Sequence, residues 1–415
     1  MNAEIISIGD ELLIGQVVNT NASWLGEQLF SLGIPVTRVI VVGDDEDAIV
    51  RAFDEAMQRS PVVVVTGGLG PTHDDITKTI ACKYFKTELI ENEAVLKHVT
   101  EIFGRRGQPL TPSNRSQALV PRNCTVLHNE LGTAPGMYFE TNGKNMFILP
   151  GVPAEMKRIF TDEITPILEK KRSGGVVLWR TLNTTGIAES LLYERMGSID
   201  DILQGKARLA FLPSFRGVRL RITVESENKE AAQKIIEEVE RRIREKAEQF
   251  IYSTGDESLE EVIGKILRER KLWLATAESC TGGLIANYIT NVSGSSDYFS
   301  RGYVTYANEA KTELLDVPAD VLSAHGAVSE EVAKAMALGA RLHAKADVAI
   351  STTGIAGPLG GSEEKPIGLV WIGYSDADRT IAKKFIFGKD RLINKERFAA
   401  AAFDLLRKML LGIPG

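Results

Sequence analysis

Cysteine is scarce in this chain of 415 residues. Only Cys82, Cys124 and Cys280 occur, and their scattered spacing matches neither a zinc site nor a disulfide framework. We therefore expect a reducing, cytoplasmic compartment. Long apolar runs are also missing, so no segment is predicted to span a membrane. Residues 1–4 lack the basic segment of a secretory signal, and we expect no such signal.

Basic charge is not in excess either. The chain has 49 Lys and Arg against 55 Asp and Glu, a formal net charge of −6, and this balance does not favour nucleic acid or an anionic membrane as a partner. The hydrophobic content of 44% and the charged content of 25% are typical of a globular protein. The length exceeds one ordinary domain. Polar, glycine-containing joins predict three domains, at residues 1–170, 171–255 and 256–415.

The first domain alternates strands with helices. Apolar, β-branched runs at 3–8, 35–42 and 62–65 predict strands, and periodic apolar residues at 22–32 and 45–60 predict helices between them. This βαβαβ order predicts an α/β domain in three layers, built on a parallel sheet with right-handed crossovers. Ligands usually bind such sheets at the carboxyl ends of the strands.

A glycine-rich loop follows the strand at 62–65. The sequence TGGLGPTHDD places Gly67, Gly68 and Gly70 where glycine permits positive φ and lets a ligand approach bare backbone. Free N–H groups at the start of the next helix would suit a phosphate. The alternative is a tight strand-to-helix turn in which Asp75 only caps that helix.

Carboxylates follow two of the strands at this edge. Asp10 and Glu11 come after the first strand, and Asp74 and Asp75 come after the third. Because the carboxyl ends of parallel strands share one edge, these side chains are predicted to converge on one cleft, where they suit a divalent metal ion. The alternative is that Asp10 and Glu11 only cap their own loop.

The middle domain is predicted to be a small α+β unit of three strands and two helices. The RNA-binding KH module has similar elements, but the GxxG clamp that it requires does not occur between residues 171 and 255. The charge run at 237–246 is mixed in sign, which is typical of a solvated face rather than a phosphate-binding one. We therefore expect a linker or dimerisation domain that does not bind nucleic acid.

The third domain contains a candidate nucleophile. A strand is expected at 272–277, and Glu278-Ser279-Cys280-Thr281-Gly282-Gly283 then leads into a helix at 284–291. A hydroxyl at such a turn lies near the N–H groups of the helix start, and those donors are expected to hold an oxyanion. Ser279 needs a base, because a neutral hydroxyl does not attack an amide near pH 7.

Lys311 is the candidate base. It lies in the first turn of a helix that begins near Asn308, where the positive helix end disfavours an ammonium ion. That placement favours the neutral amine, and burial would add to the effect. Tyr306 lies on the same strand-to-helix turn and is expected to relay the proton or to orient Lys311. The alternative is a solvated surface lysine and a packed tyrosine.

Cys280 competes with Ser279 for the role of nucleophile. A thiol is intrinsically the better nucleophile, and a helix start would lower its pKa. A cysteine mechanism usually requires an imidazole, and the available candidates are His325 and His343. Neither histidine has a spacing that points to Cys280.

Two further features of this domain suit an anion. The glycine-rich loop that begins at Thr353 can cradle a phosphate with backbone N–H groups, although no Gly-Lys-Ser/Thr ends it as in a Walker loop. Arg397 lies in the last predicted helix beside the alanines at 399–402, and small neighbours allow it to point inward to an anion. A surface arginine is the alternative.

Five motifs of the first domain resemble, in order, the molybdopterin-binding-like domain of the CinA (competence-damage-inducible) family: GDELLIG, NTN, TGGLGPTHDD, GTAPG and LPGVPAEM. The resemblance implies metal-dependent hydrolysis of ADP-ribose rather than molybdenum-cofactor chemistry. It implies that a divalent ion is held by Asp10, Asp74 and Asp75, and that the nucleotide is held by Asn19 and the glycine loop.

Four motifs of the third domain resemble the PncC nicotinamide-nucleotide amidohydrolase domain, which forms the C-terminus of the same family: AESCTGGL, GYVTYANEAK, HGAVSEE and TGIAGP. The resemblance implies metal-free deamidation of nicotinamide mononucleotide to nicotinate mononucleotide and ammonia. Leu359 departs from the pattern, because glycine is expected there. The implied catalytic residues are Ser279, Lys311, Tyr306 and Thr281, and the implied substrate-binding residues are Thr353, Gly354, Gly357 and Arg397.

The leading hypothesis is therefore a homodimeric enzyme of pyridine-nucleotide salvage with two activities. In a first alternative the amidase half works and the N-terminal half only binds a nucleotide. In a second, the chain is a competence or recombination accessory that acts through protein partners. The acidic net charge argues against DNA as the partner.

Overall fold

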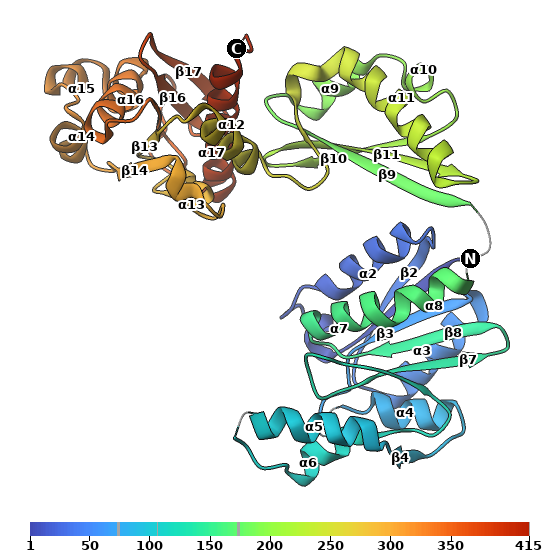
Figure 1. Ribbon diagram of the computed structural model, residues 1–415. Coiled ribbons are helices and arrows are strands. Elements are labelled where there is room, and N and C mark those ends of the chain that lie inside the picture. Colours follow the sequence, from blue (N-terminus) through green and yellow to red (C-terminus); the bar gives the residue numbers. More distant parts are fainter. Residues whose placement is uncertain (73–74, 106, 172–174, 415) are drawn as a thin grey trace. The chain divides into compact units, whose positions relative to one another are not determined.

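The computed structural model describes residues 1–72, 75–105, 107–171 and 175–414 and divides into two compact units (Figure 1). The first comprises Met1–Leu178 with Glu225–Ala232, and the second comprises Trp179–Val224 with Gln233–Gly415. Within the described residues, no helix is both long and apolar enough to cross a membrane.

The first unit is built on a six-stranded sheet of order β2-β1-β3-β8-β7-β6. The pairs β1–β2, β1–β3 and β3–β8 are parallel, as the βαβαβ pattern predicts, whereas β7 and β6 run antiparallel. Asn142 and Gly143 both have positive φ, which gives the tight hairpin between β7 and β8. The strands are β1 (Ala3–Ile8), β2 (Val36–Val42), β3 (Val62–Thr66), β6 (Thr125–Leu127), β7 (Gly136–Thr141) and β8 (Lys144–Leu149).

Helices cover both faces of this sheet and form the predicted three layers. Neighbouring strand residues point to opposite faces, so Ile5 packs with α2, α7 and α8, while Ile6 packs with α3 and α4. A π-helical turn, Phe160–Ile164, separates α7 from α8. The helices are α2 (Thr20–Ser31), α3 (Glu46–Arg59), α4 (Thr77–Tyr84), α7 (Pro153–Ile159) and α8 (Thr165–Lys171).

Shorter elements complete the first unit. A two-stranded sheet joins β4 to β5, and α5 packs through Val95 and Val99 against Ala118, which precedes β5. These elements are α1 (Asp10–Leu13), β4 (Leu89–Glu91), α5 (Glu93–Arg105), α6 (Pro112–Arg115) and β5 (Leu119–Pro121).

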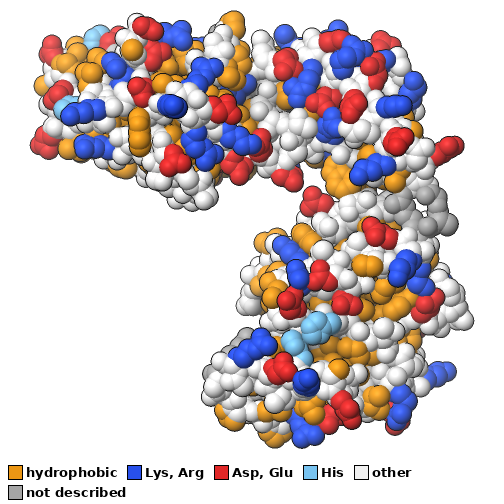
Figure 2. Space-filling model, viewed as in Figure 1, with side chains coloured by type: hydrophobic (Ala, Val, Ile, Leu, Met, Phe, Trp, Pro, Cys, Tyr) orange, Lys and Arg blue, Asp and Glu red, His pale blue; other side chains and the backbone are white. Residues whose placement is uncertain are grey.

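The middle segment forms a four-stranded sheet of order β10-β11-β9-β12, in which β10–β11 and β12–β9 pair antiparallel. Helix α11 is amphipathic and carries i,i+4 ion pairs such as Arg244–Glu240 at 2.8 Å. On the face shown in Figure 2, basic and acidic side chains alternate, in keeping with a solvated surface. The elements are β9 (Val176–Thr184), α9 (Glu189–Met196), α10 (Ile199–Leu203), β10 (Arg208–Ser214), β11 (Gly217–Ser226), α11 (Lys229–Ala247) and β12 (Ile251–Thr254).

The C-terminal segment contains a five-stranded mixed sheet of order β14-β13-β15-β16-β17. The first three strands are parallel, and β16 and β17 form an antiparallel hairpin. The strands are β13 (Leu274–Glu278), β14 (Phe299–Val304), β15 (Val348–Gly354), β16 (Leu369–Ser375) and β17 (Thr380–Ile386).

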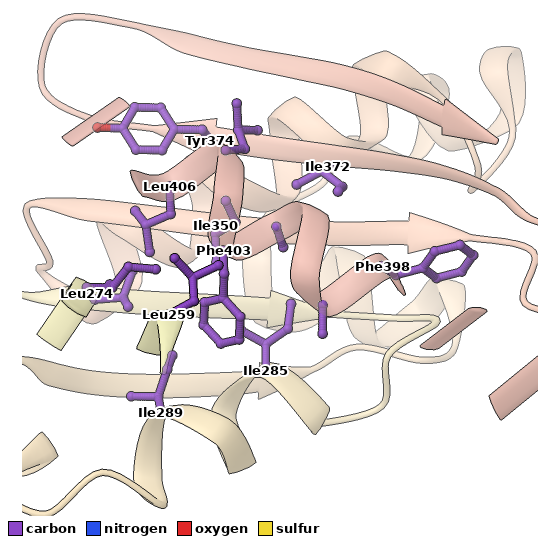
Figure 3. Close-up of a cluster of buried hydrophobic side chains, with 14 of the residues drawn as sticks. Leu259, Leu274, Ile285, Ile289, Ile350, Ile372, Tyr374, Phe398, Phe403 and Leu406 are labelled. Carbon is purple, nitrogen blue, oxygen red and sulfur yellow. The ribbon is translucent and has the colours of Figure 1, made fainter. Parts of the chain in front are cut away.

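Helices again cover both faces of this second α/β sheet. Leu274, Ile350 and Phe403 belong to the cluster under α12, α13 and α17 (Figure 3), whereas Ala275 and Ala349 face α14 and α16. The alternation along each strand therefore fills two cores. The helices are α12 (Leu259–Arg270), α13 (Leu284–Thr290), α14 (Asn308–Leu315), α15 (Ala319–His325), α16 (Glu330–Ala344) and α17 (Arg391–Leu411).

The middle and C-terminal segments of the second unit are joined by buried polar contacts. Arg216 donates to both oxygens of Glu260, at 2.8 and 2.7 Å, and lies 4.4 Å from the ring centroid of Tyr288. Arg407, which is 1% exposed, donates to the carbonyl of Gln249 at 2.7 Å. Separating the two segments would leave the buried Glu260 and Arg407 side chains without their partners, which is energetically costly. These contacts therefore hold the two segments together.

Two helical glycines make a matched stability test. A Cβ on Gly339 would lie 2.0 Å from the Leu315 carbonyl oxygen, whereas a Cβ on Gly26 would meet nothing within 4 Å. Gly339→Ala should therefore lower the free energy of unfolding of its unit by about 1–3 kcal/mol, because α16 must move away from the end of α14. Gly26→Ala should raise that of its own unit by about 0.5–1 kcal/mol. Urea unfolding followed by circular dichroism measures both, and an unchanged Gly339→Ala transition would contradict this packing.

Candidate functional site

The turn after β13 is fixed by a buried carboxylate. Glu278 is 1% exposed and accepts the N–H groups of Gly283, Ile285 and Ala286 at 3.0, 3.0 and 2.8 Å. These amides form the start of α13, and they are satisfied inside the protein. The prediction that the helix-start amides hold an oxyanion is therefore wrong for these three donors.

Ser279 is held at the entrance of this turn. Its N–H donates to the Thr352 carbonyl at 2.9 Å, and its own carbonyl accepts the N–H of Gly282 at 3.1 Å. Thr281 is fully buried, and its hydroxyl lies 2.7 Å from that of Thr352. The structure thus gives Thr281 a supporting position beneath the turn, while the half-buried Ser279 faces the site.

Lys311 lies beside Ser279. Its side chain is 1% exposed, which excludes the surface-lysine alternative, and Nζ lies 3.3 Å from Ser279 Oγ. Nζ also lies 2.9 Å from the carbonyl oxygen of Thr305, 3.2 Å from that of Tyr306 and 3.4 Å from that of Ala307.

Burial shifts the protonation equilibrium of this lysine toward the neutral amine. Removal from water lowers the pKa of Lys311 below its ordinary value, while Cys280 and Glu309 oppose the shift more weakly. A neutral amine has two N–H groups and one lone pair. If the N–H groups donate to the backbone carbonyls, the lone pair is left for the Ser279 hydroxyl. The arrangement therefore suits a general base acting on a serine.

Tyr306 contacts Lys311 through its backbone only. Its side chain is 61% exposed, and the phenol oxygen accepts a hydrogen bond from Arg391 at 3.1 Å. Arg391 also donates to the Gly357 carbonyl at 2.9 Å. The predicted relay through the phenol therefore does not match the position of the side chain. Arg391 was missed, although a cation at the first residue of a helix is electrostatically unfavourable and was a usable signal.

The alternative thiol nucleophile is unfavourable. Cys280 is 6% exposed, and burial raises the pKa of its thiol to about 12. Its two candidate imidazoles have other partners: His325 lies 3.6 Å from Glu331, and His343 lies 2.7 Å from Asp316. Burial thus suppresses the thiolate that a cysteine mechanism requires.

The remaining predicted residues of this domain divide into two groups. Thr353 is buried, and its hydroxyl donates to the Ala327 carbonyl at 2.6 Å. Gly354 ends β15, and Gly357 has a φ of +91° on the loop that Arg391 contacts. Arg397 does not join them: its guanidinium lies 5.8 Å from the ring centroid of Phe215, over a separate cleft.

The first unit contains a cleft of about 820 Å³ at the carboxyl ends of its parallel strands. A volume of this size is within the usual range for ligand sites. The described residues predicted for this site all line the cleft: Asp10, Asn19, Gly67, Gly68, Gly70 and Asp75.

The glycine loop needs its glycines for close packing. Gly67 has a φ of +114°, and a Cβ there would lie 2.1 Å from the Ile8 carbonyl oxygen. Gly68 has a φ of +65°, and its Cβ would lie 2.1 Å from Thr77 Oγ1. These contacts are those of a tight strand-to-helix turn, and the same backbone also faces the cleft. The geometry of the glycine loop is therefore compatible both with a tight turn and with a ligand-binding loop.

Carboxylates crowd one end of this cleft. The N–H of Asp10 donates to Asp44 Oδ2 at 3.1 Å, and the N–H of Asp44 donates to Asp10 Oδ1 at 3.3 Å. Burial raises the pKa of Asp44, and repulsion from Asp10, Glu11 and Asp75 adds to the shift. Asp44 was missed, although it follows β2 at the same sheet edge and the parallel topology would have found it.

The carboxylates that follow β3 were predicted to bind a metal ion in the cleft. Asp75 Oδ2 accepts the N–H of Thr72 at 3.0 Å, and α4 begins after Ile76 without a side-chain cap, so the prediction that Asp75 caps this helix is wrong. Asp74 lies outside the described residues. Among the residues that are described, no three His, Cys, Asp or Glu side chains are grouped so that they could hold a metal ion.

Polar side chains line the opposite part of the cleft. Asn19 caps α2 by accepting the Ala22 N–H at 3.1 Å and donates to Ser7 at 2.9 Å. Asn21 and Gln117 also line the cleft, and within the described residues the buried atoms Asn21 Oδ1 and Gln117 Oε1 have no hydrogen-bond partner. Unpaired buried acceptors favour a ligand with donor groups.

Comparison with known proteins identifies the family. The chain is 47% identical over 418 residues to a CinA-like protein of Chloroherpeton thalassium, and the match covers 99% of both chains. The chain belongs to the CinA family. A CinA-like protein of Salinibacter ruber is 45% identical and is covered over its full length.

The CinA family assignment extends to each segment. Residues 4–170 match the probable molybdopterin binding domain, 179–253 match the damage-inducible protein CinA KH domain, and 256–410 match the CinA C-terminal domain. The crystal structure of the competence/damage inducible protein CihA of Agrobacterium tumefaciens is 38% identical over 36% of this chain and 93% of its own, with a TM-score of 0.36. The three-domain α/β architecture predicted from the sequence is that of the CinA family.

Proposed function

We propose that the C-terminal domain hydrolyses the carboxamide of nicotinamide mononucleotide by a serine–lysine mechanism. The observation that carries the proposal is the pair Lys311–Ser279, in which a buried amine lies 3.3 Å from the hydroxyl. The motifs shared with the PncC amidohydrolase domain support the choice of substrate.

The proposed reaction uses an acyl-enzyme. Neutral Lys311 accepts the hydroxyl proton while Ser279 Oγ attacks the carboxamide carbon, and the resulting ammonium passes that proton to the leaving nitrogen, which departs as ammonia. Water, deprotonated in the same way, then cleaves the ester to give nicotinate mononucleotide and free Ser279. Within the described residues the Thr281 N–H donates to no protein group, and we assign it as an oxyanion donor.

Arg391 supports recognition of a phosphorylated substrate. Its guanidinium bonds only neutral oxygens, those of Gly357 and Tyr306, and it has no carboxylate partner among the described residues. A full positive charge therefore remains at the rim of the turn that carries Lys311, where it suits the phosphate of a mononucleotide.

We also propose that the N-terminal domain cleaves the pyrophosphate of ADP-ribose. The support is the large cleft, which combines a glycine loop, carboxylates and unpaired acceptors. A divalent ion fits the donor set: Mg²⁺ prefers carboxylate oxygens and is usually bound by one or two of them together with substrate phosphates. Asp10 and Asp75, which both line the cleft, would hold it together with the substrate phosphates, and its chemistry would be to neutralise the pyrophosphate charge. Burial raises the pKa of Asp44, and the repulsion from Asp10, Glu11 and Asp75 that adds to this shift is what such a cation would relieve.

Two alternatives remain as hypotheses. The N-terminal domain would only bind a nucleotide if no cleavage accompanies binding. A competence accessory that acts through protein partners would need neither activity, and the alternating charges visible in Figure 2 give no support to a nucleic-acid partner on that face. We retain a homodimer as the proposed assembly.

Ser279→Ala and Lys311→Met should each lower ammonia release by several orders of magnitude, and the double variant should be no worse, because nucleophile and base act as a unit. Lys311→Arg should fail as well, since a guanidinium stays protonated. Cys280→Ser is the matched control and should change the rate little. Ammonia release that survives in Ser279→Ala but not in Cys280→Ser would assign the reaction to the thiol.

The pH profile should report the neutral lysine. Because Lys311 acts as a base only when deprotonated, kcat/KM should rise with pH on a limb whose midpoint lies below the ordinary lysine pKa of about 10.4. Glu309 raises the pKa of Lys311, so Glu309→Gln should move the limb to lower pH. Glu313→Gln, which removes a different carboxylate of the same helix, should leave the midpoint of the limb unchanged. A limb that does not move in Glu309→Gln belongs to another group.

The two activities should respond differently to metal. A chelator should abolish ADP-ribose cleavage by the full chain and leave ammonia release unchanged, because the proposed cation ligands line the N-terminal cleft, whereas the proposed serine–lysine reaction requires no cation. The double change Asp10→Asn and Asp75→Asn should act like the chelator. Glu46→Gln, an exposed carboxylate on α3, is the control. Cleavage that persists in the double variant would rule out these ligands.

A further inference from the structure

A second cleft lies within the second unit, between the middle segment and the C-terminal segment, and has a volume of about 510 Å³. Its walls are the turn between β10 and β11, one face of β17 and one face of α17. Strand β17 is separated from β13 by β15 and β16, which is roughly 14 Å at the usual strand spacing. The cleft is therefore distinct from the site of Ser279.

Small residues on α17 create the space. Arg397, Ala400, Ala401, Asp404 and Lys408 line the cleft and recur at helical spacing, so they form one stripe. The two alanines lie between charged ends and leave room where larger side chains would fill the groove. The alanine run that stood out in the sequence thus belongs to this cleft, together with Arg397.

Aromatic rings form the facing walls. Lys383, Phe385 and Phe387 alternate along the chain at β17 and so point to the same side. Phe215, at the tip of the β10–β11 turn, is 53% exposed, and the guanidinium of Arg397 lies over its ring. Phe385 and Phe387 are half-buried, and together with the exposed ring of Phe215 they give the groove aromatic walls that favour a planar ligand.

The positive charge in the cleft is only partly neutralised. Asp404 is paired with Lys408 at 2.8 Å and with Arg407 at 3.2 Å. In the described part of the chain, Arg397 and Lys383 have no carboxylate partner. Arg216 also lines the cleft, but its charge is paired with Glu260.

The only other acid that lines this cleft is Glu189, in the first turn of α9. Two unpaired cations against one carboxylate leave the cleft positive. Its walls are held together by the buried contacts of Arg216 and Arg407, so the cleft exists before any ligand binds.

We propose that this cleft is a binding site for a mononucleotide, whose base packs against the phenylalanine rings and whose phosphate pairs with Arg397 and Lys383. A free phosphate would use the cations alone, and an uncharged nucleoside would use the rings alone. The combination selects a ligand that has both parts. The site takes no part in either proposed hydrolysis.

Hydrogen–deuterium exchange of the full chain with adenosine 5′-monophosphate, adenosine or inorganic phosphate tests the proposal. The monophosphate should protect peptides from 208–218 and 391–411, and either half ligand at the same concentration should protect them less. Ser279→Ala should keep this protection, because the catalytic turn lies elsewhere. No protection by the monophosphate, or equal protection by phosphate alone, would overturn the proposal.

Matched variants locate the ligand. Arg397→Met keeps the length of the side chain and should weaken protection by the monophosphate about tenfold or more. Ala401→Phe should abolish it by filling the groove. Lys384→Met removes a lysine next to Lys383 on the opposite side of β17 and should retain wild-type binding. If Arg397→Met binds as the wild type does, the cleft is not the site, and this holds even where Ala401→Phe fails to fold.

Discussion

The three hydrogen bonds from backbone amides to the buried Glu278 carboxylate determine the C-terminal site. A carboxylate without water is unstable unless its oxygens are paired, and amides at a helix start are unsatisfied unless an acceptor reaches them. The carboxylate accepts hydrogen bonds from these amides, so both groups are satisfied. These bonds fix the conformation of the turn between β13 and α13. Ser279 is the first residue of that turn, so the hydrogen bonds of Glu278 help to orient the Ser279 hydroxyl.

Burial then separates the chemical roles of three neighbouring side chains. Removing water lowers the pKa of Lys311, which favours a neutral base, and raises the pKa of Cys280 to about 12, which suppresses a thiolate. The same desolvation therefore favours the amine and opposes the thiol. Ser279, whose hydroxyl needs a base, is the one nucleophile that this environment assists. The carbonyls around Lys311 Nζ keep the amine in place, and no carboxylate among the described residues lies within hydrogen-bond distance of it.

Both α/β sheets of the chain use one topological rule. Parallel strands end at a common edge, and the segments that follow β1, β2 and β3 in the first unit, and β13, β14 and β15 in the second, carry the candidate groups. The side chains at this edge differ between the two sheets. In the first unit it is rich in carboxylates that repel one another, which suits a cation and a pyrophosphate. In the second it holds a lysine and a serine in a dry setting, which suits acyl transfer.

The sequence by itself determined the elements, their order and most of the residues at the two edges. Alternating and helical apolar periods identify β1 to β3 and α17, and glycine at positive φ identifies the turns after β3 and β13, because these properties depend on neighbours along the chain. Only the tertiary structure decided what each polar side chain meets. Glu278 accepts hydrogen bonds from the amides that were expected to bind an oxyanion. The Tyr306 phenol bonds to Arg391. Arg397 lies over the ring of Phe215 rather than beside Ser279. A helical period in the sequence predicts which residues share a face of the helix. It does not predict which element packs against that face, and the packing element supplies the partner of each charged side chain.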